Sequence, residues 1–212
     1  MARNAEQTKQ RIFDAATAEF SAHGVAGARV DRIAAAAKAN KQLIYAHFGS
    51  KRGLFEAVVS EQVTRLVHDV PFDAYDLPNW AGKTFDFLIA DAAVNRLVTW
   101  HALEPEESQH RIPIIDREIR KRIRQIKQAQ AKQHISTRLP ATELLAIANA
   151  IAATWSTGVP ERSPRRGVGA AELARRRAAV VEAVRVLVAP DGPPHRDGRP
   201  AILRSALPNL KA

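Results

Sequence analysis

The chain has 212 residues, 46% of them hydrophobic, and a formal net charge of +10. This length and hydrophobic content suffice for a packed core and so exclude a disordered polypeptide, while the basic balance favours a polyanionic partner such as nucleic acid. There is no cysteine, which excludes disulfides and thiolate metal sites.

Half of the excess charge lies in the first quarter of the chain. Residues 1–55 contain nine Lys or Arg and four Asp or Glu side chains, a balance of +5. Residues 1–11 lack the apolar core of a signal peptide, and the longest apolar stretch, residues 144–155, is too short to span a membrane. We therefore expect a cytoplasmic, nucleoid-associated protein with no membrane partner.

Helical periodicity begins near the N-terminus. Residues 6–22 are predicted to form a helix, with Gly24 past its end as a left-handed stop. Two shorter amphipathic segments follow, separated by a four-residue turn. This spacing is the outline of a helix-turn-helix, which points to DNA. The apolar positions of the three segments are Ile12, Ala16 and Phe20, then Val30, Ile33, Ala34 and Ala37, then Leu43, Ile44 and Phe48.

The second short segment has the features of a recognition helix. Asn40 stands at its start, where a side-chain oxygen can cap free backbone N–H groups. The N-terminal end of such a helix faces base edges. Lys41 and Gln42 are therefore the predicted base readers, because Lys donates to guanine and Gln pairs with adenine.

The same stretch matches a family pattern in register. An apolar helix ends in Phe and Gly, an Ile-Ala helix and a turn follow, and a second helix closes on Tyr, His and Phe before a Ser-Lys step. The matching residues are Ile12, Ala15, Ala16, Phe20, Gly24, Ile33, Ala34, Ile44, Tyr45, His47, Phe48, Ser50, Lys51 and Leu54. Over about its first fifty-five residues the chain thus resembles the tetracycline-repressor (TetR) family of bacterial transcriptional regulators.

Position in the motif and the resemblance both suggest phosphate contacts for Tyr45, His47 and Lys51. A packed ring with an exposed hydroxyl is an equally compatible interpretation of Tyr45. For His47 the alternative is a hydrogen bond at the helix end inside the module.

Two positions depart from the family pattern. Arg29 stands where members usually carry a Ser or Thr cap, and a guanidinium cannot accept a hydrogen bond from helix N–H groups. Either Arg29 contacts a phosphate instead, or the helix begins less tightly. Lys38 stands where the family commonly has Gly with positive φ, a conformation that costs a lysine about 1 kcal/mol. We expect the turn to form, with Lys38 leaning toward DNA.

The rest of the chain is predicted to be helical as well. Residues 50–69 form a connecting helix capped by Ser50, residues 71–79 a loop, and residues 80–90, 92–104 and 114–134 three further helices. The last of these has a narrow apolar stripe at Ile115, Ile119, Ile123 and Ile126. We interpret its basic coat as a solvated face, with a second polyanion contact as the alternative; the coat comprises Arg117, Arg120, Lys121, Arg122, Arg124 and Lys127.

Two more helices are predicted beyond Pro140. One ends near residue 157 and is apolar over most of its circumference; after a loop at 158–169, the other spans residues 170–189. The resemblance implies that this pair meets its two-fold mate as a four-helix bundle, the alternative being burial within one chain. Residues 190–212 form a Pro- and Gly-rich tail, either disordered or docked on the body.

The resemblance also implies an effector pocket among the central helices. The candidate lining residues are aromatic or cationic and suit a mostly apolar ligand with an acidic or polar group. For each of them a place in the core is the alternative. They are Trp80, Phe85, Arg96, Trp100, His101 and Trp155.

Enzyme motifs are missing from the sequence. There is no Gly-x-Ser-x-Gly elbow, phosphate-binding glycine loop or His-Glu-x-x-His, and no two of the seven histidines stand four residues apart as metal ligands would. We predict no catalytic residue, metal or cofactor.

The sequence as a whole predicts an all-α homodimer. Residues 1–49 would form a three-helix helix-turn-helix DNA-binding domain, and residues 50–189 a helical ligand-binding and dimerisation domain. The dimer would bind a roughly palindromic double-stranded DNA operator and respond to a small-molecule effector. One alternative is a sequence-tolerant nucleoid-type DNA-binding protein, and another is a ligand-binding protein that has lost DNA binding.

Overall fold

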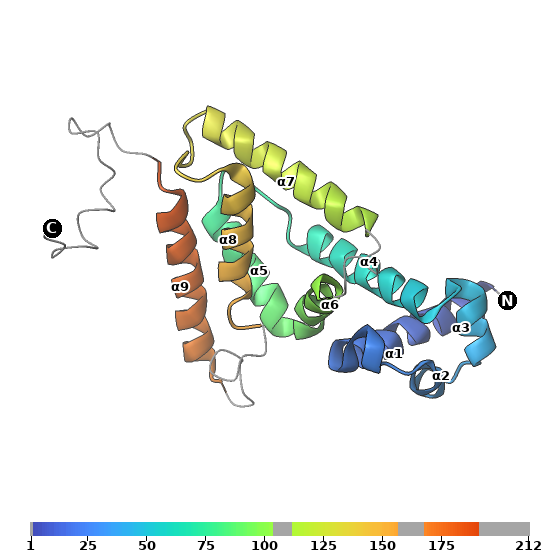
Figure 1. Ribbon diagram of the computed structural model, residues 1–212. Coiled ribbons are helices and arrows are strands. Elements are labelled where there is room, and N and C mark those ends of the chain that lie inside the picture. The colour runs from blue at the N-terminus through green and yellow to red at the C-terminus, as the bar shows by residue number, and fades with distance from the viewer. Residues whose placement is uncertain (1, 104–111, 157–167, 191–212) are drawn as a thin grey trace, which may run out of the picture.

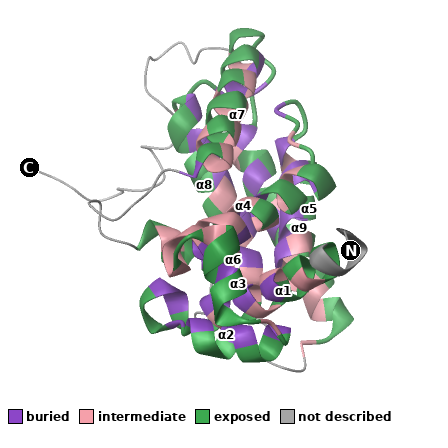
Figure 2. Ribbon diagram, turned by 90° about the vertical axis from the view of Figure 1, so that its right-hand side faces the viewer, coloured by how far each residue is buried: buried purple, intermediate pink, exposed green. Residues whose placement is uncertain are grey.

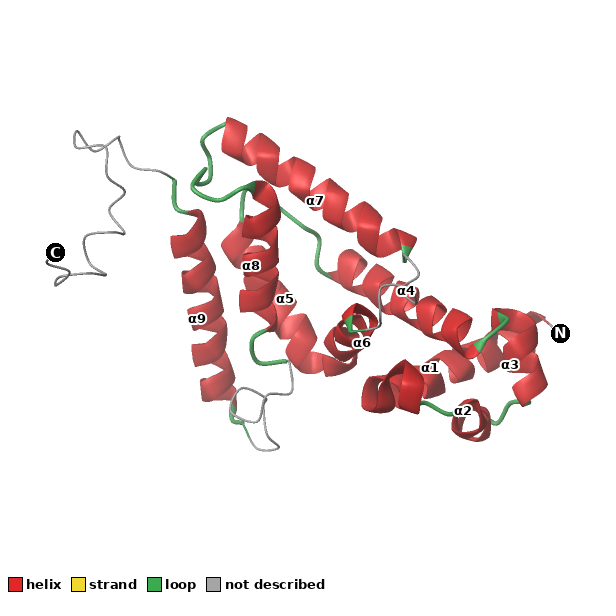
Figure 3. Ribbon diagram, viewed as in Figure 1, coloured by secondary structure: helices red, strands yellow, loops and turns green. Residues whose placement is uncertain are grey.

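The computed structural model describes residues 2–103, 112–156 and 168–190, with side chains from Glu6 onward. Within these ranges every regular element is a helix (Figure 3), which confirms the predicted all-α class. None of the described helices is long and apolar enough to cross a membrane. The helices are α1 (Ala2–Gly27), α2 (Val30–Ala37), α3 (Lys41–Phe48), α4 (Lys51–Asp69), α5 (Leu77–Ala90), α6 (Ala92–Ala102), α7 (Pro113–Ala131), α8 (Ala141–Ala153) and α9 (Ala170–Val188).

The helices form two groups joined by α4. Helices α1, α2 and α3 lie together at one end, while α5, α8 and α9 lie at the other (Figure 1). Helix α7 runs along the outside, where it contacts α4 and α8. Helix α6 belongs to both groups, because it contacts α1 and α4 on one side and α5 on the other.

Each group has its own hydrophobic core. The N-terminal core is built from α1 to α4 and extends to Leu97 of α6 and Ile112, which are both buried. The second core joins α5, α7, α8 and α9. Leu97 thus makes α6 part of the packing that holds the helix-turn-helix.

The first helix departs from the prediction at both ends. It begins at Ala2 and continues past Gly24 to Gly27 across a kink, at which Gly24 has φ 64° and ψ −176°. The predicted positive φ at Gly24 is correct, but the helix resumes instead of stopping there. The indole of Trp100 occupies the space beside Gly24, where a Cβ would lie 2.9 Å from two ring carbons.

Other helix boundaries differ from the predicted ones by a few residues. Helix α5 begins at Leu77 because Asp76 caps it, accepting from the backbone N–H of Asn79 at 3.3 Å, and Pro78 suits the first turn. Helix α4 begins where predicted, with Ser50 Oγ accepting from the N–H of Gly53 at 3.0 Å. Helix α8 ends at Ala153, earlier than expected. Most of the predicted 158–169 loop, Glu104 and the tail beyond Pro190 lie outside the described residues.

Candidate DNA interface and central cavity

A carboxylate from α1 closes the start of α2. Arg29 makes no side-chain cap, as expected. Instead, its backbone N–H donates to Glu19 Oε1 at 2.8 Å, and Arg32 Nε donates to the same oxygen at 2.8 Å. The hydrogen bond from Arg32 is the main reason why the pKa of Glu19 lies below its ordinary value. Helix α2 therefore begins tightly despite Arg29, and the guanidinium of Arg29 is exposed.

The turn between α2 and α3 uses the conformation that the sequence predicted. Lys38 adopts φ 51° and ψ 43°, which is the left-handed helical region. Its side chain is exposed. The strain of about 1 kcal/mol is therefore tolerated at a site where glycine would carry none.

Helix α3 is capped as predicted, but its buried face is narrower than predicted, because Leu43 is 37% exposed. Asn40 Oδ1 accepts from the backbone N–H of Gln42 at 2.8 Å, and Ile44 is fully buried against the N-terminal core. The predicted contact residues Lys41, Gln42, Tyr45 and His47 are all exposed. Figure 2 shows the exposed faces of α2 and α3 turned outward at one end of the molecule. The module thus offers one polar face to a partner.

Lys51 takes part in a contact that the sequence did not reveal. Its Nζ donates to the carbonyl oxygens of Ala26 at 3.3 Å and Ala28 at 3.1 Å, and the side chain is half-buried. The ammonium therefore ties the start of α4 to the end of α1. A phosphate contact by Lys51 stays a prediction.

An acidic side chain lies among the predicted DNA contacts. Asp31, in the first turn of α2, pairs with Lys41 at 2.8 Å between Oδ1 and Nζ. Hydrogen bonding between the two lowers the pKa of Asp31 and raises that of Lys41. Arg29 and Tyr45 are near enough to perturb the pKa of Lys41 as well. Asp31 therefore lies within a cluster of residues that the sequence assigned to DNA.

Comparisons with known proteins agree with this geometry. The model for bacterial regulatory proteins of the tetR family matches residues 12–58, and that for the tetracyclin repressor-like C-terminal domain matches residues 76–185. The HTH-type transcriptional repressor SCO4008 of Streptomyces coelicolor is 40% identical over 162 residues, 76% of this chain and 83% of that protein. The chain belongs to the TetR family.

The TetR family consists of transcriptional regulators, so this protein is a DNA-binding transcriptional regulator and not an enzyme. The crystal structure of SCO4942 from S. coelicolor, described as a transcriptional regulator, covers 87% of this chain and 99% of its own at 35% identity and a TM-score of 0.72. A shorter match, 41% identical over 58 residues, links the chain to the repressor NicS of Pseudomonas putida and covers 27% of each protein.

A cavity of about 390 Å³ lies among α4, α5, α6, α7 and α8. This volume falls within the usual range of small-molecule sites. Its wall is mostly aliphatic and is interrupted by five polar side chains. The lining residues are Val63, Leu66, Val67, Thr84, Leu88, Val94, Asn95, Val98, Ile115, Glu118, Ile119, Arg122, Asn149, Ala150 and Ala153.

Three polar atoms of this lining have no hydrogen-bond partner among the described residues. They are Thr84 Oγ1, Asn95 Nδ2 and Arg122 Nε, and all three are buried. The guanidinium of Arg122 stacks over the rings of Phe72 and Trp80 at 5.3 and 5.5 Å, and its burial lowers its pKa. A buried donor without an acceptor costs free energy, so an acceptor brought to any of these atoms would be stabilising.

The residues predicted to line a pocket are not brought together around this cavity. Trp80 and Phe85 are buried in the second core, where the alternative interpretation placed them. Phe85 does border a smaller hollow of about 290 Å³ between α5 and α9. The ring of Trp155 packs edge to face against that of Phe85 and lies 5.7 Å from the Arg176 guanidinium. A role in ligand binding stays a prediction for all six residues.

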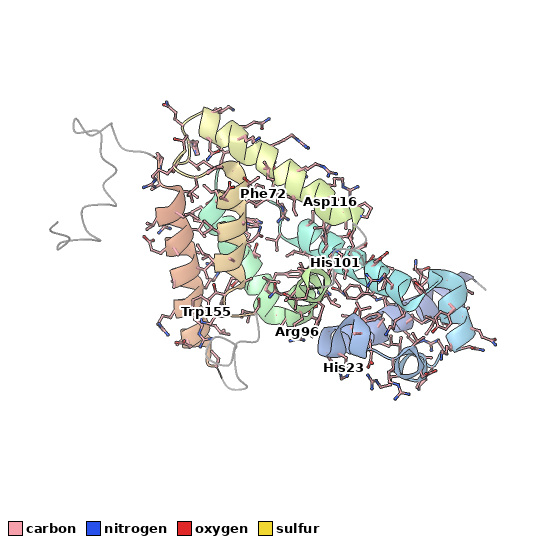
Figure 4. The ribbon with its side chains drawn as sticks, in the orientation of Figure 1. His23, Phe72, Arg96, His101, Asp116 and Trp155 are labelled. Carbon is pink, nitrogen blue, oxygen red and sulfur yellow. The ribbon has the colours of Figure 1, made fainter. Side chains whose placement is uncertain are left out.

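The other three predicted residues lie on α6. Arg96 is exposed. Trp100 packs on Gly24 of α1 and donates to the carbonyl of Ser21 at 3.4 Å, while the ring of His101 lies 6.4 Å from that of Phe55. Figure 4 shows Trp155 apart from Arg96 and His101, which both lie on α6. Helix α6 therefore turns Val94, Asn95 and Val98 to the cavity and its aromatic residues to the DNA-binding end.

The sequence does not predict the polar lining of the cavity. Arg122 belongs to the basic coat that is interpreted as a solvated face of α7, but it is half-buried and borders the cavity. A signal was present, because Ile115, Ile119, Arg122 and Ile126 recur at spacings of four, three and four residues and so share one helix face. Arg122 replaces an apolar residue in that stripe.

Proposed function

We propose that this TetR-family protein is a ligand-responsive repressor. As a homodimer it binds a palindromic operator through α3 and leaves it when a small molecule fills the central cavity. The observation that carries the proposal is the position of α6, which lines the cavity with Val94, Asn95 and Val98 and packs on α1 through Leu97 and Trp100. A ligand that favours a different α6 position lowers operator affinity by its differential binding to the two states.

Exposed apolar residues on the last two helices support the homodimer. Ile147 of α8 is 39% exposed and Val186 of α9 is 64% exposed in the single chain, and the two helices pack side by side (Figure 1). A second copy packed on α8 and α9 across a two-fold axis would remove these apolar side chains from water. The two α3 helices would then lie about 34 Å apart, one turn of DNA.

The cavity favours an effector with an apolar body and at least one hydrogen-bond acceptor. The aliphatic wall accommodates the body. Asn95 Nδ2 and Arg122 Nε are donors only, and the Thr84 hydroxyl can donate as well. An acceptor oxygen or nitrogen placed against one of them would remove the cost of leaving that donor unpaired.

Selection from a random DNA pool tests the operator model. Purified protein is used to enrich bound duplexes, and the winner is titrated against its scrambled sequence at physiological salt. A specific repressor yields an inverted repeat that it binds roughly 10³-fold or more tightly than scrambled DNA. The enriched duplex then serves as the reporter in a screen for small molecules that release the protein.

One observation favours a second candidate, a sequence-tolerant nucleoid-type protein. The outer face of α7 carries exposed cations at Arg117, Arg120, Lys121, Arg124 and Lys127, which could contact further phosphates. In that case the pool yields no enriched sequence, although binding is strong and falls steeply with salt. The absence of any binding would instead indicate a ligand-binding protein that has lost its operator.

A further inference from the structure

We infer that Asp31 is a specificity-determining residue: it holds the base reader Lys41 in place and penalises contacts with DNA that is not the operator. The inference rests on the proposed function, because it concerns the same α3 interface. Asp31 itself was not among the residues predicted to contact DNA.

The carboxylate of Asp31 lies on the face that is predicted to contact DNA. Its Oδ1 lies 2.8 Å from Lys41 Nζ at the first residue of α3, and the side chains of Asp31 and Lys41 are 63% and 46% exposed. Lys41 contacts it and Arg29 is near enough to lower its pKa as well, and both cations are predicted to face DNA. An acid on this face repels phosphates, so that its presence lowers affinity for any duplex.

Stability of the fold does not account for this acid. Exposed ion pairs contribute little to stability because solvent screens them and two long side chains must be ordered. An acid in the first turn does interact favourably with the dipole of α2, but that effect would not require Lys41 as a partner. The pairing therefore has its main consequence at the DNA surface.

The chemistry of lysine gives the ion pair its effect on base reading. An ammonium on a flexible four-carbon stem has three donors and no preferred direction. With one donor directed to Asp31, the stem is held and the remaining donors can reach guanine N7 and O6. On a sequence without acceptors at that position, Lys41 can reach a phosphate only by giving up Asp31. The ion pair thus allows Lys41 to contact guanine in the operator and weakens its phosphate contacts on other sequences.

The test compares two variants that change the net charge equally. Asp31→Asn removes the partner of Lys41, whereas Asp14→Asn removes an exposed carboxylate on α1 that accepts from Gln10. Each variant is titrated with the selected duplex and with its scrambled sequence at several salt concentrations. We expect Asp31→Asn to lower the selectivity ratio roughly fivefold, the scale of one exposed charge pair. The slope of log K against log salt on scrambled DNA should steepen by about 0.9, the value for one more phosphate contact.

A double-variant cycle shows whether Lys41 carries the effect. In a Lys41→Ala background, Asp31→Asn should leave the selectivity ratio unchanged. The inference is overturned if Asp31→Asn alone does not alter the ratio, if Asp14→Asn alters it equally, or if the effect persists without Lys41. Circular dichroism of each variant confirms folding. A wild-type protein that does not discriminate between the two duplexes would refute the operator model itself, and the inference with it.

Discussion

At the scale of single residues, the carboxylate of Glu19 holds the start of α2 from outside that helix. Its side chain is 10% exposed, and its Oε1 accepts from the Arg29 N–H and from Arg32. Charge-assisted hydrogen bonds of this kind contribute about 1–3 kcal/mol. We expect Glu19→Gln to lower the free energy of unfolding by roughly that amount at neutral pH, as measured by chemical denaturation.

The pH dependence of this contribution has a definite sign. The folded state holds the pKa of Glu19 below its ordinary value of 4.5, so the unfolded state binds more protons over that window. The stabilisation is therefore fully present above pH 4.5 and is lost as the pH falls through the lowered pKa. The difference in free energy of unfolding between Glu19→Gln and wild type should therefore become smaller under acidic conditions. Glu61→Gln, at an exposed position of α4, is the control for the loss of one carboxylate.

A second prediction at this scale concerns the unpaired hydroxyl in the cavity. Thr84 is 5% exposed and its Oγ1 has no described partner. Thr84→Val keeps the shape and removes the unpaired group, so we expect the ligand-free protein to gain up to about 1 kcal/mol while its effector response weakens. Thr99→Val is the matched control, because that hydroxyl is exposed and bonds to the Asn95 carbonyl at 2.8 Å. A loss of stability in Thr84→Val would show that the hydroxyl is satisfied.

At the scale of elements, the kink in α1 is the joint between the DNA-binding module and α6. Gly24 lies in a region of φ and ψ that other residues hardly occupy, at a cost of about 1–3 kcal/mol. An added Cβ would also displace the Trp100 ring. Gly24→Ala should therefore destabilise the protein by at least that cost in thermal or chemical unfolding.

Gly27 offers an internal control three residues away. A Cβ at that position would meet His23 Cβ at 3.4 Å, which is an ordinary contact. Gly27→Ala should leave the free energy of unfolding within about 0.5 kcal/mol of wild type. Equal effects of the two substitutions would show that neither the backbone conformation of Gly24 nor its contact with Trp100 matters.

The same elements show how far the sequence could predict the molecule. Ser50 and Asn40 predict the starts of α4 and α3, because helix capping depends only on neighbouring residues. The positive φ of Lys38 is predictable for the same reason, since turn geometry is local. The Trp100 ring that packs beside Gly24 comes from more than seventy residues away, and no local pattern reveals that contact. The cavity is formed by five helices, so its lining cannot be predicted from the pattern of any one helix. The aromatic residues that the sequence suggests for a pocket lie mostly in the core, whereas Thr84 lines the cavity.

In the molecule as a whole, α6 connects the N-terminal core to the cavity. Leu97 packs with the DNA-binding core, while Val94 and Val98 on the same helix line the cavity. A rigid α6 cannot adjust to a ligand without altering its contact with α1. In the proposed function, a ligand in the cavity would change the spacing of the two recognition helices in this way, with the two bodies fixed to each other by the proposed dimer interface.

The interface itself gives the last prediction. Val186 is 64% exposed on α9, and a charge there would be buried without a partner in a dimer formed by α8 and α9. Val186→Glu should therefore be monomeric in light scattering, and operator affinity should fall by about 10²–10⁴, because the second half-site loses the advantage of linkage. Leu103→Glu makes the same charge change at the end of α6, where Leu103 is 67% exposed, and should remain dimeric with full affinity. If Val186→Glu remains dimeric, the interface lies on another face of the protein.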